Sequence, residues 1–277
     1  MYKVVADSSA EVDAPFLERY PVTLIPFKLY LDGKEYIDDA TLDVDAFVQA
    51  MKASANTPKS ACPSPHEFLV QYENAEEDEV YVVTISANLS GTYNSAMLAK
   101  DLYEGEGGPK KKIHVFDSLG AAASETLVVK KIHDMKAEGA SFEALVEAVE
   151  LYIQNTTVYF ISESLDNLMK NGRIPKWKGI IASKLHILPI MGADKNGEIK
   201  LVETVRNSNK AYKRLVEIVQ QELVKNGRKI VALTHVGNWE RANQIVSELK
   251  HVEEVFNIKC AGLSSLYADK KGIIIAF

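Results

Sequence analysis

The chain has 277 residues, of which 47% are hydrophobic and 25% charged, with a net charge of −6 and a pI near 5.6. This length suits two domains of ordinary size or one large one. The composition is that of a globular protein and excludes extended disorder, collagen and coiled coil. The acidic balance does not favour nucleic acid or anionic membranes as partners.

Residues 1–155 alternate between predicted strands and helices, which indicates an α/β fold with a mainly parallel sheet. Asp32-Gly33 is a hairpin turn signal, and Ser64 with Glu67 forms a capping box after which a helix should begin. The predicted helices cover residues 43–55, 92–103, 121–137 and 141–154, besides the one that begins at Ser64. The predicted strands cover residues 2–6, 22–31, 34–37, 80–85 and 113–116.

Residues 156–277 differ in pattern, because hairpins mix with helices, and we expect a second α+β domain with a mixed or antiparallel sheet. The domain boundary is placed near residue 155. A hairpin turn is predicted at Lys195-Asn196-Gly197. The predicted helices cover residues 165–169, 207–225 and 239–249, and the predicted strands cover 157–161, 187–191, 199–205, 229–234, 255–260 and 273–277.

The common signatures of enzymes and secreted proteins are missing from the sequence. No P-loop, dinucleotide-binding, nucleophile-elbow or H-E-x-x-H pattern occurs, and the six histidines are scattered. Cys62 and Cys260 are too far apart in sequence to indicate a disulfide framework or a paired-cysteine zinc site. Neither a signal-peptide profile nor a run of ~18 apolar residues is present. We therefore expect a cytoplasmic protein with no metal, no cofactor and no stable membrane insertion.

Small hydroxyl residues follow three predicted strands of the first half, in Asp7-Ser8-Ser9, in residues 86–92 and in Asp117-Ser118. In open α/β sheets, ligands bind at the carboxyl ends of the strands. A helix that begins after Gly91 would also direct free backbone N–H groups there. Such a site can hold a carboxylate without a lysine or arginine. For Ser8 and Ser118 a plain helix cap explains the residue equally well.

Several segments resemble the DegV family of bacterial fatty-acid-binding proteins. Residues 85–96, ISANLSGTYNSA, look like its S-S-x-L-S-G-T-Y-x-S-A signature, and Leu168 to Ile174 resembles its L-K-x-G-G-R-I. Residues 7–11, 60–65, 195–206 and 273–277 match further family segments in order. The resemblance therefore spans almost the whole chain.

The resemblance implies one long-chain fatty acid in a tunnel between two α/β domains, presented to a separate fatty-acid kinase. The protein would be a lipid carrier and not itself an enzyme. The family holds the carboxylate by hydroxyls of its T-S-x-P and S-G-T loops and by a histidine of a C-terminal H-T-G-P-G segment. Carried over by position, the ligand-binding residues are Ser60, Ala61, Ser90, Gly91, Thr92, Arg173 and Tyr267.

The C-terminal segment departs from the family pattern, because Tyr267 stands where the family has histidine and both glycines are lost. Ala61 and Cys62 also replace polar family residues. A phenol can donate one hydrogen bond to a carboxylate, but it does not become a cation near neutral pH. A diverged module for another lipid or small anion is therefore an alternative, as is a hydrolase that uses Ser90 with an unidentified base.

The acyl tail requires an apolar tunnel, for which the candidates by location are Phe27, Leu29, Phe160, Ile161, Ile190 and Met191. Ordinary core packing is the commoner role for each.

The segment 170–214 has a local charge of +8, which leaves −14 for the rest of a chain of net charge −6. Such asymmetry is typical of a docking face for an acidic partner, although a solvated surface explains it equally well. The resemblance implies kinase docking near Arg206, with Lys200 and Lys210 beside it. The eleven basic residues are Lys170, Arg173, Lys176, Lys178, Lys184, Lys195, Lys200, Arg206, Lys210, Lys213 and Arg214.

Overall fold

A computed structural model describes residues 1–105, 111–174, 187–269 and 271–277. The sheet of the first half has the strand order β2-β1-β6-β7, and all its strands pair in parallel, as the sequence predicted. Both faces are covered, since Val4 and Ala6 pack into one core and Val5 into another. The strands are β1 (Tyr2–Asp7), β2 (Thr23–Ile25), β6 (Glu79–Thr84) and β7 (Lys112–Asp117).

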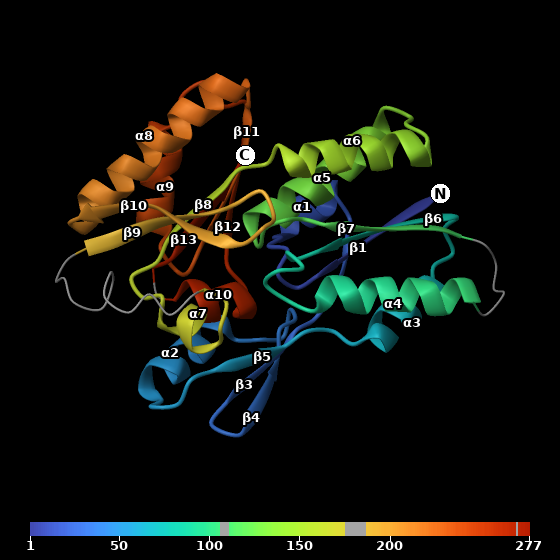
Figure 1. Ribbon diagram of the computed structural model, residues 1–277, viewed down its shortest axis with the longest axis horizontal. Coiled ribbons are helices and arrows are strands. Elements are labelled where there is room, and N and C mark those ends of the chain that lie inside the picture. Colours follow the sequence, from blue (N-terminus) through green and yellow to red (C-terminus); the bar gives the residue numbers. More distant parts are fainter. Residues whose placement is uncertain (106–110, 175–186, 270) are drawn as a thin grey trace.

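Helices cover the two faces of this sheet, which gives three layers (Figure 1). On one face lie α3 (Pro65–Glu73) and α4 (Thr92–Gly105), and on the other lie α5 (Ala123–Ala137) and α6 (Phe142–Gln154). The capping box of Ser64 and Glu67 is present at the start of α3, as predicted.

Six strands form the sheet of the second half in the order β10-β9-β8-β13-β11-β12. Only β11 and β12 pair in parallel, so the sheet is mixed. Helices α8 (Ser208–Asn226) and α9 (Trp239–Glu248) cover one face. The strands are β8 (Val158–Ile161), β9 (Ile187–Ala193), β10 (Ile199–Arg206), β11 (Ile230–His235), β12 (Glu254–Lys259) and β13 (Ile273–Ala276).

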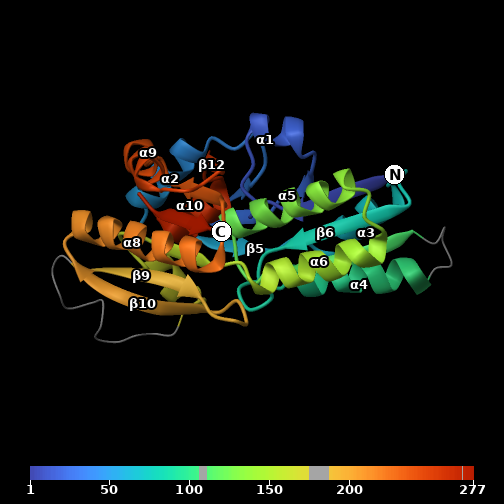
Figure 2. The ribbon, with the colours of Figure 1, turned by 90° about the horizontal axis from the view of Figure 1, so that it is seen from above.

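Helix α5 lies between the two large sheets (Figure 2). Its residues are buried almost continuously from Ala123 to Lys130, because it packs on β1 and β6 on one side and on β11 and β13 on the other. One hydrophobic cluster accordingly joins Val83 of the first sheet to Ala232 and Phe256 of the second. The strands of the two large sheets come from before and after residue 155, respectively, but one hydrophobic core joins both sheets. The two-domain description therefore stays a prediction.

A small antiparallel sheet corrects one predicted strand. The sequence indicates a single strand over residues 22–31, yet β2 ends at Ile25 and β3 (Lys28–Leu31) belongs to another sheet. Pro26 stands at the break and has no N–H to donate to a ladder. The Asp32-Gly33 hairpin to β4 (Lys34–Ile37) is confirmed, with φ values of 52° and 77° at the turn.

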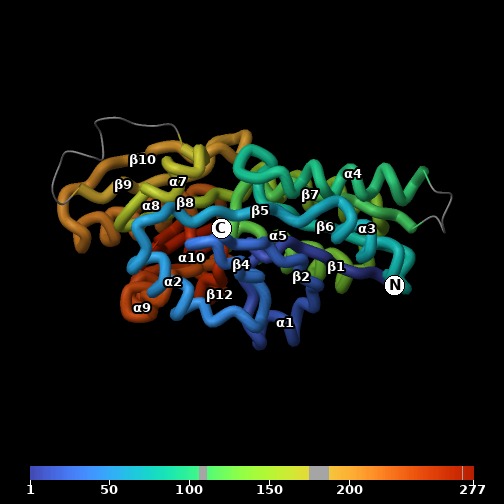
Figure 3. The backbone as a smooth tube through the Cα atoms, turned by 90° about the horizontal axis from the view of Figure 1, so that it is seen from below, coloured from blue at the N-terminus to red at the C-terminus, as the bar shows by residue number. Residues whose placement is uncertain are grey.

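Several short elements were not predicted. No strand is predicted over residues 58–63, but β5 (Lys59–Ala61) lies there and pairs with β3. Helices α1 (Ala14–Arg19) and α10 (Gly262–Ala268) were also missed, whereas α2 (Val44–Ala53) and α7 (Asp166–Lys170) match predicted helices. Figure 3 shows β5 on the stretch of chain that crosses the middle of the molecule from α2 to α3.

Candidate functional site

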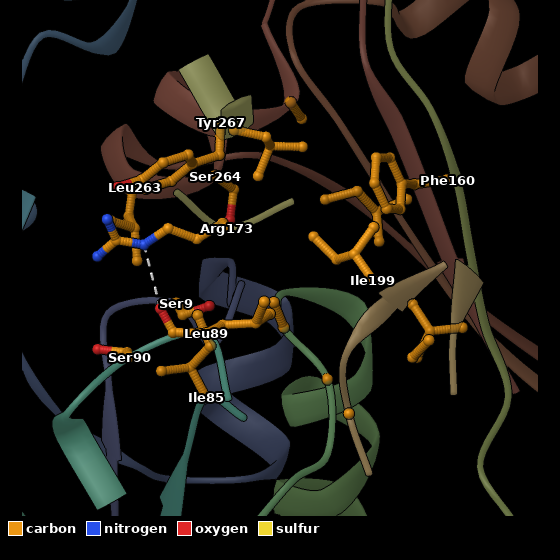
Figure 4. A pocket seen from close by; sticks show the side chains of 18 of the residues that line it. Ser9, Ile85, Leu89, Ser90, Phe160, Arg173, Ile199, Leu263, Ser264 and Tyr267 are labelled. Carbon is orange, nitrogen blue, oxygen red and sulfur yellow. Dashed lines mark hydrogen bonds between the residues drawn. The ribbon is translucent and has the colours of Figure 1, made fainter. Parts of the chain in front are cut away.

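A cavity lies between the loops that follow the first sheet, the second sheet and helix α10 (Figure 4). It encloses about 830 Å³ of empty space, including its open mouth. Its lining residues are Ser9, Phe27, Ser60, Ile85, Leu89, Ser90, Gly120, Ala121, Val158, Phe160, Leu168, Arg173, Gly192, Ala193, Gly197, Ile199, Leu263, Ser264, Tyr267, Ala268 and Ile274.

Polar side chains gather at one end of this cavity, where Ile85, Leu89 and Leu263 also lie, whereas Phe160 and Ile199 lie at the opposite end. Figure 4 shows Ser9, Ser90, Arg173 and Tyr267 together, with Phe160 and Ile199 on the opposite side. Ser60 joins the polar end, because its Oγ lies 2.9 Å from the Tyr267 Oη. The cavity thus has a hydrogen-bonding end and a hydrophobic end.

Ser90 reaches the cavity from the loop that precedes α4. Its Oγ lies 2.8 Å from the Oγ1 of Thr92, the first residue of that helix. Thr92 is fully buried and Gly91 is exposed, and neither lines the cavity. Thr92 therefore contacts the site through the Ser90 hydroxyl, while the ligand contact expected of Gly91 is not supported by its position.

Strand β5 brings Ser60 to the cavity and turns Ala61 away. Successive side chains of a strand point to opposite faces. Ser60 is half-buried in the lining, whereas Ala61 is exposed. Ala61 does not line the cavity, so its position does not support the predicted contact, which stays a prediction.

Arg173 lies beside Tyr267 as the one charged side chain in the described lining. Its guanidinium carbon is 5.7 Å from the centre of the Tyr267 ring. Its Nε donates to the Leu89 carbonyl at 3.2 Å, and its Nη1 donates to the Asn171 carbonyl at 2.5 Å. These bonds hold a positive charge at the polar end without an acidic partner in the lining.

Ser8 and Ser118 lie outside the lining, and their hydroxyls have internal partners. The Ser8 Oγ donates to Asp38 at 2.8 Å and accepts from the Phe27 N–H at 3.0 Å. The Ser118 Oγ bonds with the backbone of Gly120. Both positions are explained by local structure, and neither places a hydroxyl in the cavity.

Ser9 and Ser264 line the cavity and were missed as site residues. Ser9 belongs to the predicted Asp7-Ser8-Ser9 loop, where only the direction of each side chain separates it from Ser8. Ser264 lies on α10, which was not predicted. The sequence signal for Ser9 was present, and that for Ser264 was absent.

Four carboxyl groups are buried behind the polar end: Asp7, Glu11, Asp38 and Glu125, each at most 2% exposed. Asp7 accepts from the Ser9 N–H at 2.9 Å, directly behind the lining. Burial raises the pKa of Glu11 to about 8, and burial also raises the pKa of Asp7, Asp38 and Glu125. A carboxyl group whose pKa is raised carries less negative charge at a given pH, so burial reduces the repulsion between this cluster and an anionic head group nearby.

A DegV family model, described as an uncharacterised protein family, matches residues 1–268. The chain belongs to the DegV family. A DegV domain-containing protein of Streptococcus pneumoniae is 36% identical over 289 residues, covering 100% of this chain and 98% of the relative. The family resemblance of the sequence motifs is thus confirmed.

Solved DegV-family structures have the same fold. One from Ruminococcus gnavus, with vaccenic acid, gives a TM-score of 0.94 at 36% identity, covering 100% of this chain and 99% of that one. One from Eubacterium eligens, loaded with heptadecanoic acid, gives 0.89 at 30% identity over 100% and 99%. The Streptococcus pneumoniae Fatty Acid Kinase (Fak) B3 protein, loaded with linoleic acid, gives 0.88 at 31% identity over 100% and 99%.

Only part of the predicted DegV tunnel lining lies in the cavity. Phe27 and Phe160 line it, but Leu29, Ile161, Ile190 and Met191 are fully buried in hydrophobic clusters. The neighbours Phe160 and Ile161 lie on opposite faces of β8. The candidates chosen by location therefore mixed lining residues with core residues.

The basic surface is present where the described residues allow it to be seen. Lys200 and Arg206 are exposed on β10, whose residues alternate in burial, and Lys210 is exposed in the first turn of α8. Lys176, Lys178 and Lys184 lie outside the described residues. The docking role of this surface stays a prediction.

Neither a metal centre nor a membrane span is found in the described part of the chain. Its histidine, cysteine and acidic side chains include no group of three or more suited to holding a metal ion. None of its helices combines the length and apolar character that crossing a bilayer requires.

Proposed function

We propose that this DegV-family protein binds one long-chain fatty acid in its cavity and presents the carboxylate to a separate fatty-acid kinase. The observation that carries the proposal is the two-ended cavity, with hydroxyls and Arg173 at one end and apolar side chains at the other. The fatty acids named for three similar structures support the same class of ligand.

Affinity and orientation come from different ends of such a ligand. Each buried CH₂ contributes ~0.8 kcal/mol, so about 14 of them contribute on the order of 11 kcal/mol before the costs of binding. A hydrogen bond adds about 1 kcal/mol, and somewhat more to a charged acceptor. The tail therefore dominates affinity, while Ser60, Ser90, Tyr267 and Arg173 fix where the carboxylate lies.

Native mass spectrometry of the purified protein tests this proposal. We expect a mass increment that matches a C14–C20 fatty acid, with the same acid recovered in an organic extract. An empty protein that takes up neither oleate nor palmitate would contradict the proposal. Uptake of another lipid or of a small anion would favour the diverged module instead.

Tyr267→Phe and Ser60→Ala test the head-group contacts. We expect each variant to bind oleate about tenfold more weakly, because each removes one hydroxyl near a charged acceptor. The fold-loss of oleate affinity in the double variant should be smaller than the product of the two single fold-losses, since the two hydroxyls bond to each other. Isothermal titration calorimetry measures the effect. Tyr30→Phe is the control, since Tyr30 donates to Glu35 away from the cavity. If both test variants bind oleate as tightly as wild type, these head-group contacts are rejected.

The described surroundings of Ser90 do not favour a hydrolase. Its hydroxyl bonds with the Thr92 hydroxyl, and the described lining contains neither histidine nor a carboxylate. A serine nucleophile needs an adjacent base. We therefore propose that Ser90 binds the ligand and does not act as a nucleophile.

The double variant Lys200→Glu/Arg206→Glu tests the kinase partnership. We expect oleate affinity to stay unchanged. Acyl-phosphate formation with a bacterial fatty-acid kinase should be at least about tenfold slower, because the two new glutamates would repel the acidic surface that we propose for the kinase. Lys52→Glu, an exposed change on α2, is the control. Equal rates for wild type and the double variant would place the docking surface elsewhere.

A further inference from the structure

Helix α10 begins against two carboxyl groups that come from the other end of the sequence. The N–H groups of Gly262 and Leu263 donate to the two oxygens of Asp38 at 2.6 and 3.1 Å. The Ala261 N–H donates to Glu11 Oε2 at 2.8 Å. Both acids are 2% exposed. Three of the N–H groups that a helix start leaves without intrahelical partners are thus bound by the first half of the chain.

Asp38 is itself held in place from its own side. Its Oδ2 also accepts from the Ser8 hydroxyl at 2.8 Å, and its backbone N–H donates to the Phe27 carbonyl at 2.9 Å. The approach to α10 is close, because a Cβ added to Gly262 would lie 2.6 Å from Asp38 Oδ1 and 2.7 Å from Leu29 Cδ1. Only glycine fits at position 262 without moving these neighbours.

The far end of α10 is tied to the second half. The Ser162 Oγ donates to the Ala268 carbonyl at 2.6 Å, and Asn167 Nδ2 donates to the Leu266 carbonyl at 2.8 Å. Leu263, Ser264, Tyr267 and Ala268 of this seven-residue helix line the cavity. The start of α10 and Tyr267 belong to the same short helix, so we expect a shift of its start to displace Tyr267.

We propose that Asp38, assisted by Glu11, is a positioning residue that fixes the start of α10 on the first half of the chain and thereby holds Tyr267 against Ser60 at the polar end of the cavity. Asp38 does not contact the ligand. It acts through the backbone of residues 262 and 263, and its effect on ligand binding rests on the proposed fatty-acid site.

Asp38→Asn tests this role, because it keeps the size of the side chain and replaces one acceptor oxygen by an N–H donor. In the ligand-free protein we expect about tenfold faster hydrogen exchange in the peptide that contains residues 261–268. Exchange as slow as in wild type would overturn the proposal. Asp101→Asn, an exposed change on α4, is the control. Because this measurement needs no ligand, it tests the link between Asp38 and α10 even if the protein binds no fatty acid.

A double-mutant cycle separates positioning from general stability. We expect Asp38→Asn to weaken oleate binding about tenfold in the wild-type background but no more than about twofold beside Tyr267→Phe. Equal losses in both backgrounds would show that Asp38 does not act through Tyr267 and would overturn the proposal. If Asp38→Asn does not fold, Ser8→Ala removes only one bond to Asp38, and the same two comparisons apply with smaller changes in the same direction.

Discussion

Ile199→Trp should abolish tight binding of long-chain fatty acids while the protein stays folded. Ile199 is the first residue of β10, and its side chain points into the apolar end of the cavity (Figure 4). An indole that displaces about four methylene groups would remove about 3 kcal/mol of tail burial. That corresponds to about 150-fold weaker binding of oleate. Calorimetric titration and the absence of lipid in an extract of the purified variant check this result.

A matched substitution and a shorter ligand separate a filled cavity from a damaged fold. Thr204 is exposed on the same strand, so Thr204→Trp adds the same indole outside the cavity and should bind oleate normally. Decanoate, whose tail is shorter, should lose much less affinity than oleate in Ile199→Trp. Equal losses for both acids, or oleate bound as tightly as in wild type, would show that the tail does not run past residue 199.

The sequence predicted the long elements well because their signals are local. The near-continuous β-branched run at residues 80–85 became the buried strand β6, and the glycine of the Asp32-Gly33 turn adopts the positive φ that the hairpin needs. Ser90 was found because its loop carries a family motif. Ser9 was missed as a cavity-lining residue because two adjacent serines differ only in which way they point, and that direction depends on the register of β1.

Helix α10 had no local signal that would have predicted it. It has seven residues, begins with glycine and contains two serines, which makes it a poor isolated helix. Its first N–H groups are bound by Asp38 and Glu11, which lie more than 200 positions away. The position of Tyr267 thus depends on tertiary contacts that periodicity does not reveal, which is why the residue could be named as a candidate but its contact with Ser60 could not.

The free energy of unfolding should fall as the pH rises from about 6.5 to about 8.5, above the range in which His235, whose pKa burial lowers to about 4, has the opposite effect. Burial raises the pKa of Glu11 to about 8 and raises the pKa of Asp7 and Glu125, and the nearest charges that act on them are other carboxyls. An acid whose pKa is higher in the folded than in the unfolded state binds more protons when folded. Its contribution is complete below the unfolded value near 4.5 and is lost as the pH passes the folded value. Each pKa unit between the folded and the unfolded value corresponds to about 1.4 kcal/mol, so the free energy of unfolding should fall by on the order of 3 kcal/mol or more.

Glu125→Gln identifies the source of that loss. Glu125 is fully buried on α5, and neither carboxyl oxygen has a hydrogen-bond partner among the described residues. Burial and the neighbouring Asp7 carboxyl disfavour its ionisation more than the nearby Ser9 and Ala122 favour it, and a neutral amide of the same shape avoids that cost. We expect the variant to unfold at a higher temperature than wild type at pH 8.5 and to differ little at pH 5.5, whereas Glu147→Gln, an exposed change on α6, should leave the pH dependence intact. Thermal unfolding followed by circular dichroism across this range decides the matter. Wild-type stability that rises with pH, or a Glu125→Gln curve parallel to wild type, would mean that the buried cluster is not protonated in the folded protein.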